Sequence, residues 1–312
     1  MIVVSILCLT YNHAPYIRQC LDGILMQKCD FEYEVLIHDD ASTDGTSDII
    51  REYQEKFGNI IKPIIQKENQ FKLGLKGVNI KYNFPRVKGK YVAMCEGDDY
   101  WTDKIKLQQQ VDFLERNREY SMVFSNRLIV DSEGKIIRKD VSDKAIYTVK
   151  DIVDGFIPST QSMLYRFYPG LIDFITRGKG FYSGDRLISY YLSLHGNIYR
   201  IPAILAAYRD TGTGIWTSYD EFDRLRQHEI HLESFHKFIG FDLRDPTFAK
   251  NAFFKLYGIL IYGLKHPSYF FKRKYYGLFL SIWRRYAYMN RLKLLIHATI
   301  RKLKRIFART NE

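Results

Sequence analysis

The heptapeptide CEGDDYW, residues 95–101, places three carboxylates within four positions: Glu96, Asp98 and Asp99. It follows directly on an apolar run, so the acids come where a buried strand is predicted to end. Carboxylates this close repel one another unless a basic side chain or a divalent cation lies among them. Only two lysines follow closely, and both fall on the next predicted helix. The spacing therefore favours a metal site over a solvated loop whose aspartates cap that helix.

A second acidic pair, Asp39 and Asp40, ends the apolar run YEVLIH in the same way. These carboxylates can accept hydrogen bonds from the N–H of a nucleobase or from a ribose hydroxyl. A cation held by Asp98 and Asp99 can bridge a diphosphate and neutralise the charge that develops as the diphosphate leaves. Together the two pairs favour a site for a nucleoside diphosphate, although Asp39 and Asp40 also fit a plain turn.

Strand and helix patterns alternate along the part of the chain that carries these acids. Strands are predicted at residues 2–9, 33–38, 60–65 and 91–95, and Pro63 would place the third of them at an edge of the sheet. Helices are predicted to begin after Asn12, at Thr46 and after Thr102, with Asn12 and Thr102 as N-caps. This order predicts an α/β fold with a mostly parallel central sheet and flanking helices. Ligands of such sheets bind at the carboxyl ends of the strands, so we expect both acidic pairs to face one crevice.

Composition and missing motifs narrow the class of protein. The 312 residues are 46% apolar and 15% aromatic, which is enough for a large globular core. The turn LTYNHAPY lacks the glycine patterns of dinucleotide folds and P-loops, and also the basic loop that a nucleotidyltransferase would need. Four cysteines without a C-x-x-C pair indicate reduced thiols and a cytosolic protein. No uncharged apolar run reaches about 18 residues, and the N-terminus MIVVSILCL is expected to form a strand, not a signal peptide.

The net charge of +12 comes from the end of the chain. From Lys265 onward there are 13 lysines and arginines and a single acid, Glu312, whereas the first 264 residues are neutral overall. Between residues 284 and 309 the apolar residues form one helical stripe, with most basic residues off it. We therefore predict a domain at 1–222 and a helical, basic, membrane-associating region at 223–312. A helix pair packed on the enzyme is the alternative, and no nucleic-acid-binding module is recognised.

Three segments resemble the donor-binding half of the family-two glycosyltransferases, which have the GT-A fold: VSILCLTYNHAPYIRQCLDGIL, YEVLIHDDASTDGTSDII and KGKYVAMCEGDDYWTDKIKLQQQVDFL. The resemblance covers roughly residues 1–215. It implies a nucleoside pocket lined by Thr10, Tyr11 and Asn12, with Asp40 at the base and Asp39 beside it. It also implies that EGDD occupies the place of the family's D-x-D motif, that Asp98 and Asp99 contact the ribose and a divalent cation, Mn²⁺ or Mg²⁺, and that Glu96 replaces an aspartate in the donor site.

The same resemblance implies one in-line displacement with inversion, and a base that deprotonates the acceptor hydroxyl. Asp185, in YSGDRLISYYLSLHG, matches the third acidic motif and is the predicted base, with a plain helix N-cap as the alternative. YRDTGTGIW resembles the mobile loop that closes over the donor. There Arg209 would meet the diphosphate and Trp216 would stack on a sugar, unless they are a surface arginine and a packed tryptophan. Thr211 stands where many relatives carry histidine.

These observations predict a metal-dependent inverting glycosyltransferase that adds single sugars from a nucleotide-diphospho-sugar, with a UDP-sugar favoured. The acceptor would be a glycan of polysaccharide biosynthesis, in a lipid-linked form if the basic tail binds the anionic inner face of the cytoplasmic membrane. The runner-up is a non-catalytic scaffold that binds a nucleotide-sugar at the membrane, because Glu96 and Thr211 depart from the family pattern.

Overall fold

The computed structural model describes residues 1–178, 184–212 and 221–240. Contacts within the chain divide it into two units, Met1–Tyr219 and Asp220–Glu312. The boundary predicted after residue 222 stays a prediction. Trp216 and the basic residues from Lys265 onward lie outside the described residues.

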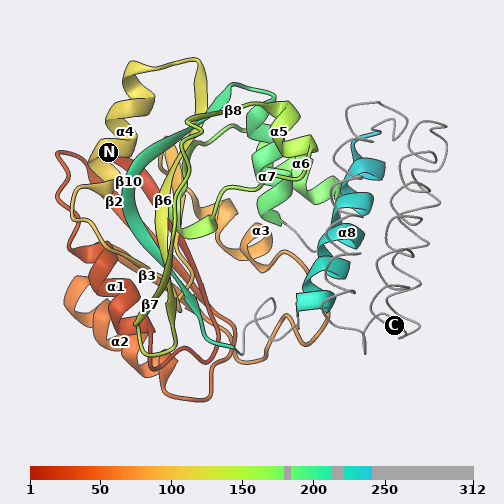
Figure 1. Ribbon diagram of the computed structural model, residues 1–312. Coiled ribbons are helices and arrows are strands. Elements are labelled where there is room, and N and C mark those ends of the chain that lie inside the picture. The colour runs from red at the N-terminus through yellow and green to blue at the C-terminus, as the bar shows by residue number, and fades with distance from the viewer. Residues whose placement is uncertain (179–183, 213–220, 241–312) are drawn as a thin grey trace, which may run out of the picture. The chain divides into compact units, whose positions relative to one another are not determined.

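The described part of the first unit is built on one ten-stranded sheet (Figure 1). Its strands are β1 (Ile2–Thr10), β2 (Glu32–Asp39), β3 (Ile61–Ile65), β4 (Tyr91–Met94), β5 (Tyr100–Trp101), β6 (Tyr120–Asp131), β7 (Ile136–Asp140), β8 (Ile146–Tyr147), β9 (Leu164–Arg166) and β10 (Asn197–Asp210). The strand order is β3-β2-β1-β4-β9-β6-β10-β5, with β7 paired to β6 and β8 paired to β10. The α/β fold with a central sheet and flanking helices is therefore confirmed.

The strands from β3 to β4 pair in parallel, as the alternation of strands and helices predicts. Beyond β4 the sheet is mixed, because β9 pairs antiparallel with both β4 and β6. β6 and β7 pair antiparallel and form a hairpin around the sequence DSEG. The predicted edge strand is β3, which contains Pro63 and pairs only with β2 among the described strands.

Helices flank the sheet (Figure 1). They are α1 (Ile17–Leu25), α2 (Thr46–Phe57), α3 (Val78–Tyr82), α4 (Lys106–Arg116), α5 (Val149–Val153), α6 (Leu171–Arg177) and α7 (Gly184–Ser193), with short 3₁₀ turns η1 (Phe84–Arg86) and η2 (Thr160–Ser162). Figure 1 shows α1, α2 and α4 on one side of the sheet and α5, α6 and α7 on the other. The second unit contributes α8 (Glu221–Phe238). No helix in the described ranges is long and apolar enough to cross a bilayer.

Core packing fixes β5, which directly follows the three acids of the segment 95–101. Residues from β1, β2, β4, α1 and α4 form one buried apolar cluster that includes Trp101 of β5. Gly23 lets α1 approach β5 closely, because a Cβ there would lie 2.9 Å from the Trp101 carbonyl oxygen. The Trp101 indole N–H donates to the Gln161 carbonyl at 2.8 Å. Trp101 therefore anchors the end of the segment 95–101 in the core.

Two predicted helix caps are wrong. Asn12 does not cap α1, whose N-cap is Tyr16, but adopts φ 53° and bonds to the loop after β2. Thr102 does not cap α4, which begins four residues later with Ile105 at its N-cap. The Thr102 hydroxyl instead points to the Ile204 carbonyl at 3.5 Å. Both polar side chains were assigned to the nearest helix, whereas distant segments of the fold provide their partners.

Lys106, the first residue of α4, is fully buried. Its ammonium lies 4.1 Å from the centroid of the Trp101 ring and donates to Gln110 Oε1 at 2.8 Å. Burial lowers the pKa of Lys106 to about 7, although the nearby Cys95 opposes this shift. Below this pKa a positive charge stays buried without a carboxylate partner among the described ion pairs, which is unfavourable.

We expect Lys106→Met to raise the unfolding temperature relative to wild type at pH 7, and this difference to shrink as the pH rises to 10. The folded-state pKa lies below the ordinary lysine value, so between these two values the unfolded chain binds more protons and wild-type stability increases with pH. Thermal unfolding at pH 7, 8, 9 and 10 measures this. Lys104→Met, at an exposed position, is the control and should show no such trend. A difference that is constant with pH would contradict the account.

Candidate functional site

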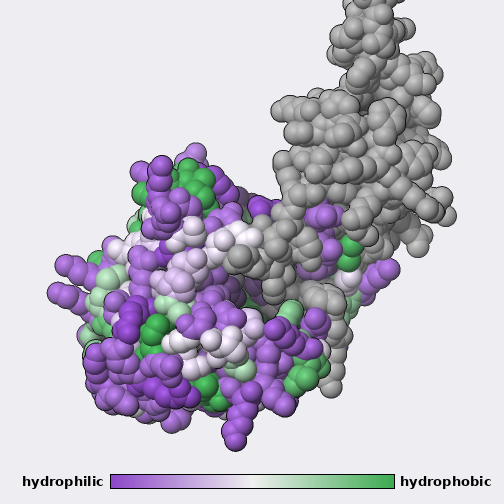
Figure 2. All heavy atoms as spheres, turned by 90° about the horizontal axis from the view of Figure 1, so that it is seen from below, coloured by the Kyte–Doolittle hydropathy of each residue, from purple (hydrophilic) through white to green (hydrophobic). Residues whose placement is uncertain are grey.

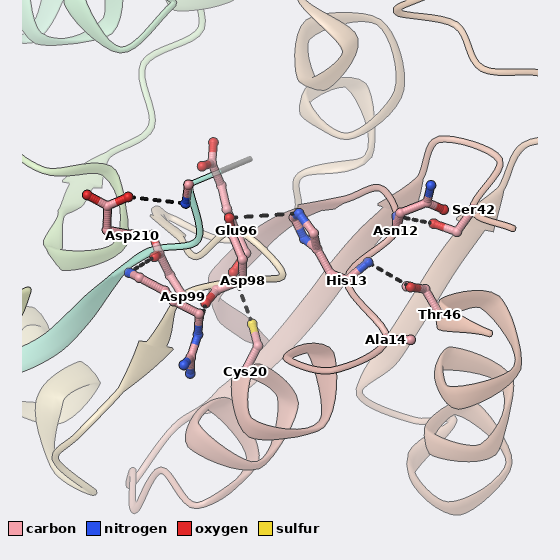
Figure 3. Close-up of polar contacts among 12 residues, drawn as sticks. Asn12, His13, Ala14, Cys20, Ser42, Thr46, Glu96, Asp98, Asp99 and Asp210 are labelled. Atoms are coloured by element: carbon pink, nitrogen blue, oxygen red, sulfur yellow. Dashed lines mark hydrogen bonds and ion pairs between the residues drawn. The ribbon is translucent and has the colours of Figure 1, made fainter. Parts of the chain in front are cut away.

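The three acids that follow β4 converge in the structure. Glu96, Asp98 and Asp99 each offer a carboxylate oxygen, and the three oxygens lie within 4.8 Å of one another. Asp99 is buried, the Asp98 side chain is 18% exposed, and Glu96 is exposed. Figure 3 shows their loop between His13, which follows β1, and Asp210, which ends β10. The cluster is thus reachable from solvent and surrounded by loops at the carboxyl ends of strands.

The carboxylates perturb one another. Loss of hydration around the Glu96 carboxylate raises its pKa, and the negative charges of Asp98 and Asp185 raise it further, to about 8. Burial, and then the charges of Asp98, Cys95 and Glu96, raise the pKa of Asp99. A cation among these oxygens would relieve the repulsion, and an all-oxygen donor set suits a hard ion such as Mg²⁺ or Mn²⁺. The residues present therefore fit a divalent cation.

Asp185 lies in the first turn of α7. One of its carboxylate oxygens accepts the backbone N–H of Arg186 at 2.8 Å. Asp185 is far from the acidic loop in sequence, yet its charge contributes to the raised pKa of Glu96. The predicted base therefore interacts electrostatically with one carboxylate of the predicted cation site.

The first acidic pair is tied into loops. Asp39 accepts hydrogen bonds from the hydroxyls of Ser42 and Ser47, and both serines follow β2. The two oxygens of Asp40 accept the backbone N–H groups of Gln70 and Phe71 at 2.8 and 3.0 Å. Both aspartates come at the end of β2, as predicted, and both are buried. They fix the loops beside the crevice, and each Asp40 oxygen keeps a lone pair for a further donor.

The residues after β1 form one wall of this region. Thr10 is 3% exposed and, among the described contacts, its hydroxyl has no hydrogen-bond partner. The Tyr11 hydroxyl accepts a hydrogen bond from Lys72 at 3.1 Å. Asn12 bonds to Ser42 and Thr43, at 2.8 Å in each case. The loops after β1, β2 and β3 are therefore joined, so the predicted nucleoside-pocket residues lie together.

His13 is a site residue that the sequence did not reveal. Its Nε2 lies 3.8 Å from Asp98 Oδ2 (Figure 3). Gly97 permits this close approach, because a Cβ at that position would lie 2.5 Å from the Thr10 hydroxyl and 3.0 Å from His13 Nδ1. A search for metal-ligand spacing along the sequence misses His13, because the acid beside it, Asp98, follows a different strand. The adjacency of β1 and β4 was the signal that could have found it.

Arg209, near the end of β10, lies against the acidic loop and is 3% exposed. Its backbone N–H donates to Asp99 Oδ1 at 2.8 Å, and its Nε donates to the Asp98 carbonyl at 2.9 Å. Its guanidinium also donates to the carbonyls of residues 131 and 132 and to the Gln19 side chain. Trp216, the other residue predicted in this loop, lies outside the described residues.

Comparisons with known proteins agree with this geometry. The family model described as "Glycosyl transferase family 2" matches residues 5–179. An uncharacterized protein of Mycobacterium tuberculosis is 34% identical over 223 residues, 69% of this chain and 60% of that protein. The putative teichuronic acid biosynthesis glycosyltransferase TuaG of Bacillus subtilis is 31% identical over 157 residues, 50% of this chain and 58% of that protein. The chain thus spans about 60% of the length of these relatives.

A solved structure shows the same fold. The crystal structure of S. aureus TarS 1–349 in complex with UDP-GlcNAc matches with a TM-score of 0.61 and 18% sequence identity. The match covers 94% of this chain and 84% of that one. At this level of identity the likeness establishes the arrangement of strands and helices, which is the GT-A arrangement.

Proposed function

The chain belongs to glycosyl transferase family 2, and from this premise we propose that it is an inverting glycosyltransferase. It would move one sugar from a nucleotide-diphospho-sugar to a hydroxyl of a glycan acceptor. The observation that supports the proposal is the cluster of Glu96, Asp98 and Asp99 in the loop after β4, at the carboxyl end of that strand. The charge of Asp185 also contributes to the raised pKa of Glu96. A UDP-sugar is the favoured donor, and the likeness to a protein crystallised with UDP-GlcNAc supports this choice.

The donor would lie along the loops after β1, β2 and β4. Thr10, Tyr11 and Asn12 would line the nucleoside pocket, and Asp40 would use its remaining lone pairs to accept a base N–H. Asp39 would hold the loop behind it through its two serine contacts. Asp98 would contact both the ribose and the cation, as Glu96 and Asp99 complete the donor set.

A cation bound by Glu96, Asp98 and Asp99 would neutralise the charge that develops on the departing diphosphate. In the same step the acceptor oxygen would bond to the anomeric carbon from the opposite face, as the bond to the diphosphate breaks. Asp185 would take the proton of the acceptor hydroxyl, so the acceptor attacks as a strong nucleophile. One displacement of this kind inverts the anomeric configuration and needs no covalent intermediate.

The test is release of nucleoside diphosphate from a panel of UDP-, GDP- and dTDP-sugars by the full chain. Release should occur with one nucleotide class, should require Mn²⁺ or Mg²⁺, and should stop when a chelator is added. Turnover that continues unchanged in the chelator would remove the metal from the proposal. A lack of turnover with binding retained would favour the non-catalytic scaffold.

We propose further that the basic tail attaches the enzyme to an anionic membrane face. The attached enzyme could then use a lipid-linked glycan in that membrane as its acceptor. The support is the sequence alone, with 13 basic residues and one acid from Lys265 onward. Near an anionic bilayer each basic residue adds about 1 kcal/mol of binding. The full chain should therefore float with phosphatidylserine-containing liposomes at low salt, and a chain ending at residue 264 should not. Equal flotation of both chains would contradict this role.

A further inference from the structure

We propose that Arg209 is a positioning residue, which holds the acidic loop in the shape that binds the cation. This inference rests on the proposed function, because it assumes that Glu96, Asp98 and Asp99 bind a divalent ion. It differs from the expectation that Arg209 contacts the diphosphate. The contacts that surround its guanidinium carry the inference.

Arg209 bonds to the acidic loop at two points. Its backbone N–H donates to Asp99 Oδ1, which fixes the orientation of one carboxylate of the cluster. Its Nε donates to the carbonyl of Asp98, which fixes the backbone from which the next carboxylate projects. Position 209 thus holds two of the three clustered acids, Asp99 through its backbone and Asp98 through the arginine side chain. Partners of this kind orient ligands for metal binding.

The other end of the guanidinium is anchored to the remaining elements around the loop. Nη1 donates to the carbonyls of Asp131 and Ser132 at 3.3 and 3.1 Å, at the turn between β6 and β7. Nη2 donates to Gln19 Oε1 on α1. Arginine offers five N–H donors in a rigid fork, so one side chain can fix the acidic loop relative to both a helix and a hairpin.

Two aromatic rings also contact the guanidinium. Its Cζ lies 4.8 Å from the ring centroid of Tyr16, just before α1, and 5.3 Å from that of Tyr100 in β5. The side chain makes no ion pair within 4.0 Å among the described residues. Its charge is therefore stabilised by carbonyls and ring faces, and its burial leaves little surface for a diphosphate oxygen. This environment suits a support beneath the site better than a contact to the substrate.

The experiment measures the affinity of the full chain for Mn²⁺ alone, from the electron paramagnetic resonance signal of the free ion. Arg209→Lys keeps the charge but loses the fork, and we expect roughly 10- to 100-fold weaker Mn²⁺ binding, the usual effect of losing a supporting partner. Gln19→Ala removes one anchor at an exposed position and should weaken binding roughly fivefold, as for one hydrogen bond.

Arg127→Lys is the matched control. Arg127 lies on the neighbouring strand β6, donates to Asp140 at 2.9 Å and sits 5.2 Å from the Tyr208 ring centroid, but does not bond to the acidic loop. Its variant should bind Mn²⁺ like wild type. A purely structural role for Arg209 would lower the unfolding temperature and leave the Mn²⁺ affinity of the folded fraction unchanged.

The outcomes separate this inference from the proposed function. Mn²⁺ binding by wild type, together with folded Arg209→Lys and Gln19→Ala proteins whose affinity is within about twofold of it, would overturn the inference alone. If Arg209→Lys does not fold, Gln19→Ala decides by the same criterion. Absence of Mn²⁺ binding by wild type would overturn the cation site itself, and the positioning role with it.

Discussion

Asp185→Asn is expected to lower kcat by about 10²- to 10⁴-fold, the contribution usual for a positioned general base. The amide has nearly the same shape but cannot accept the proton of the acceptor hydroxyl. Its oxygen can still accept the Arg186 backbone N–H, so the start of α7 should be unchanged. Affinity for UDP with Mn²⁺ should stay within about threefold of wild type, because no donor contact is assigned to this residue.

Asp173→Asn is the matched control, because Asp173 is an exposed acid in the first turn of α6. It should leave kcat unchanged. Initial rates of nucleotide release at saturating donor and acceptor, with Kd measured separately by calorimetry, distinguish the two variants. If Asp185→Asn keeps wild-type kcat, Asp185 is a helix cap and the base must be sought elsewhere. If it loses donor binding instead, its place is in the donor pocket.

Asp98→Asn is expected to weaken Mn²⁺ binding by at least about 100-fold, because a metal ligand contributes more than a residue that only supports a ligand. It should also lower kcat/KM by about 10³-fold, because the cation stabilises the leaving diphosphate. Among the described residues, the Asp98 carboxylate has an ion pair with His13, at 3.8 Å, and no side-chain hydrogen bond. Removal of its charge should therefore alter the cation site and leave the fold intact. The unfolding temperature should change by no more than a few degrees.

Excess Mn²⁺ should restore part of the activity of Asp98→Asn, because weak binding is overcome by concentration. Asp143→Asn carries the same change of charge at an exposed position distant in sequence, and should show wild-type dependence on Mn²⁺. A rate that depends on Mn²⁺ equally in wild type and Asp98→Asn would contradict the assignment of Asp98 as a ligand.

Much of the site could be predicted because it obeys a rule of topology. Apolar runs followed directly by acids identified the ends of β2 and β4, and parallel strands bring such ends to one edge. Asp185 could be found only through the family resemblance, since a lone acid at a helix start is more often a cap. In the folded chain its charge contributes to the raised pKa of Glu96, although more than 80 residues separate them.

The residues that the sequence misplaced have partners from distant segments. Asn12 and Thr102 were assigned to helices beside them, but Ser42, Thr43 and Ile204 are their partners. The dual contacts of Asp40 with residues 70 and 71, and those of Arg209 with the acidic loop, likewise need the folded chain. A local pattern indicates that a polar side chain has a partner, but not which partner.

The exposed hydrophobic residues of the domain bear on the proposed membrane attachment. Exposed aliphatic residues are scattered along the described chain, with Ile136 and Ile137 adjacent to each other. On the face shown in Figure 2 the hydrophobic residues form small separate patches among polar residues. Such patches are ordinary on soluble domains. The proposed membrane attachment therefore rests on the sequence of the basic tail.

The most direct test of the central claim is thermal unfolding of the full chain with UDP, dTDP, GDP and CMP, each with Mn²⁺ or with a chelator. A nucleotide at about 100 times its Kd adds about 2.7 kcal/mol to the free energy of unfolding, which shifts the midpoint visibly. The account predicts a shift with UDP and Mn²⁺ that disappears in the chelator. No shift with any nucleotide, with or without metal, would contradict a carboxylate-bound cation that holds the donor diphosphate.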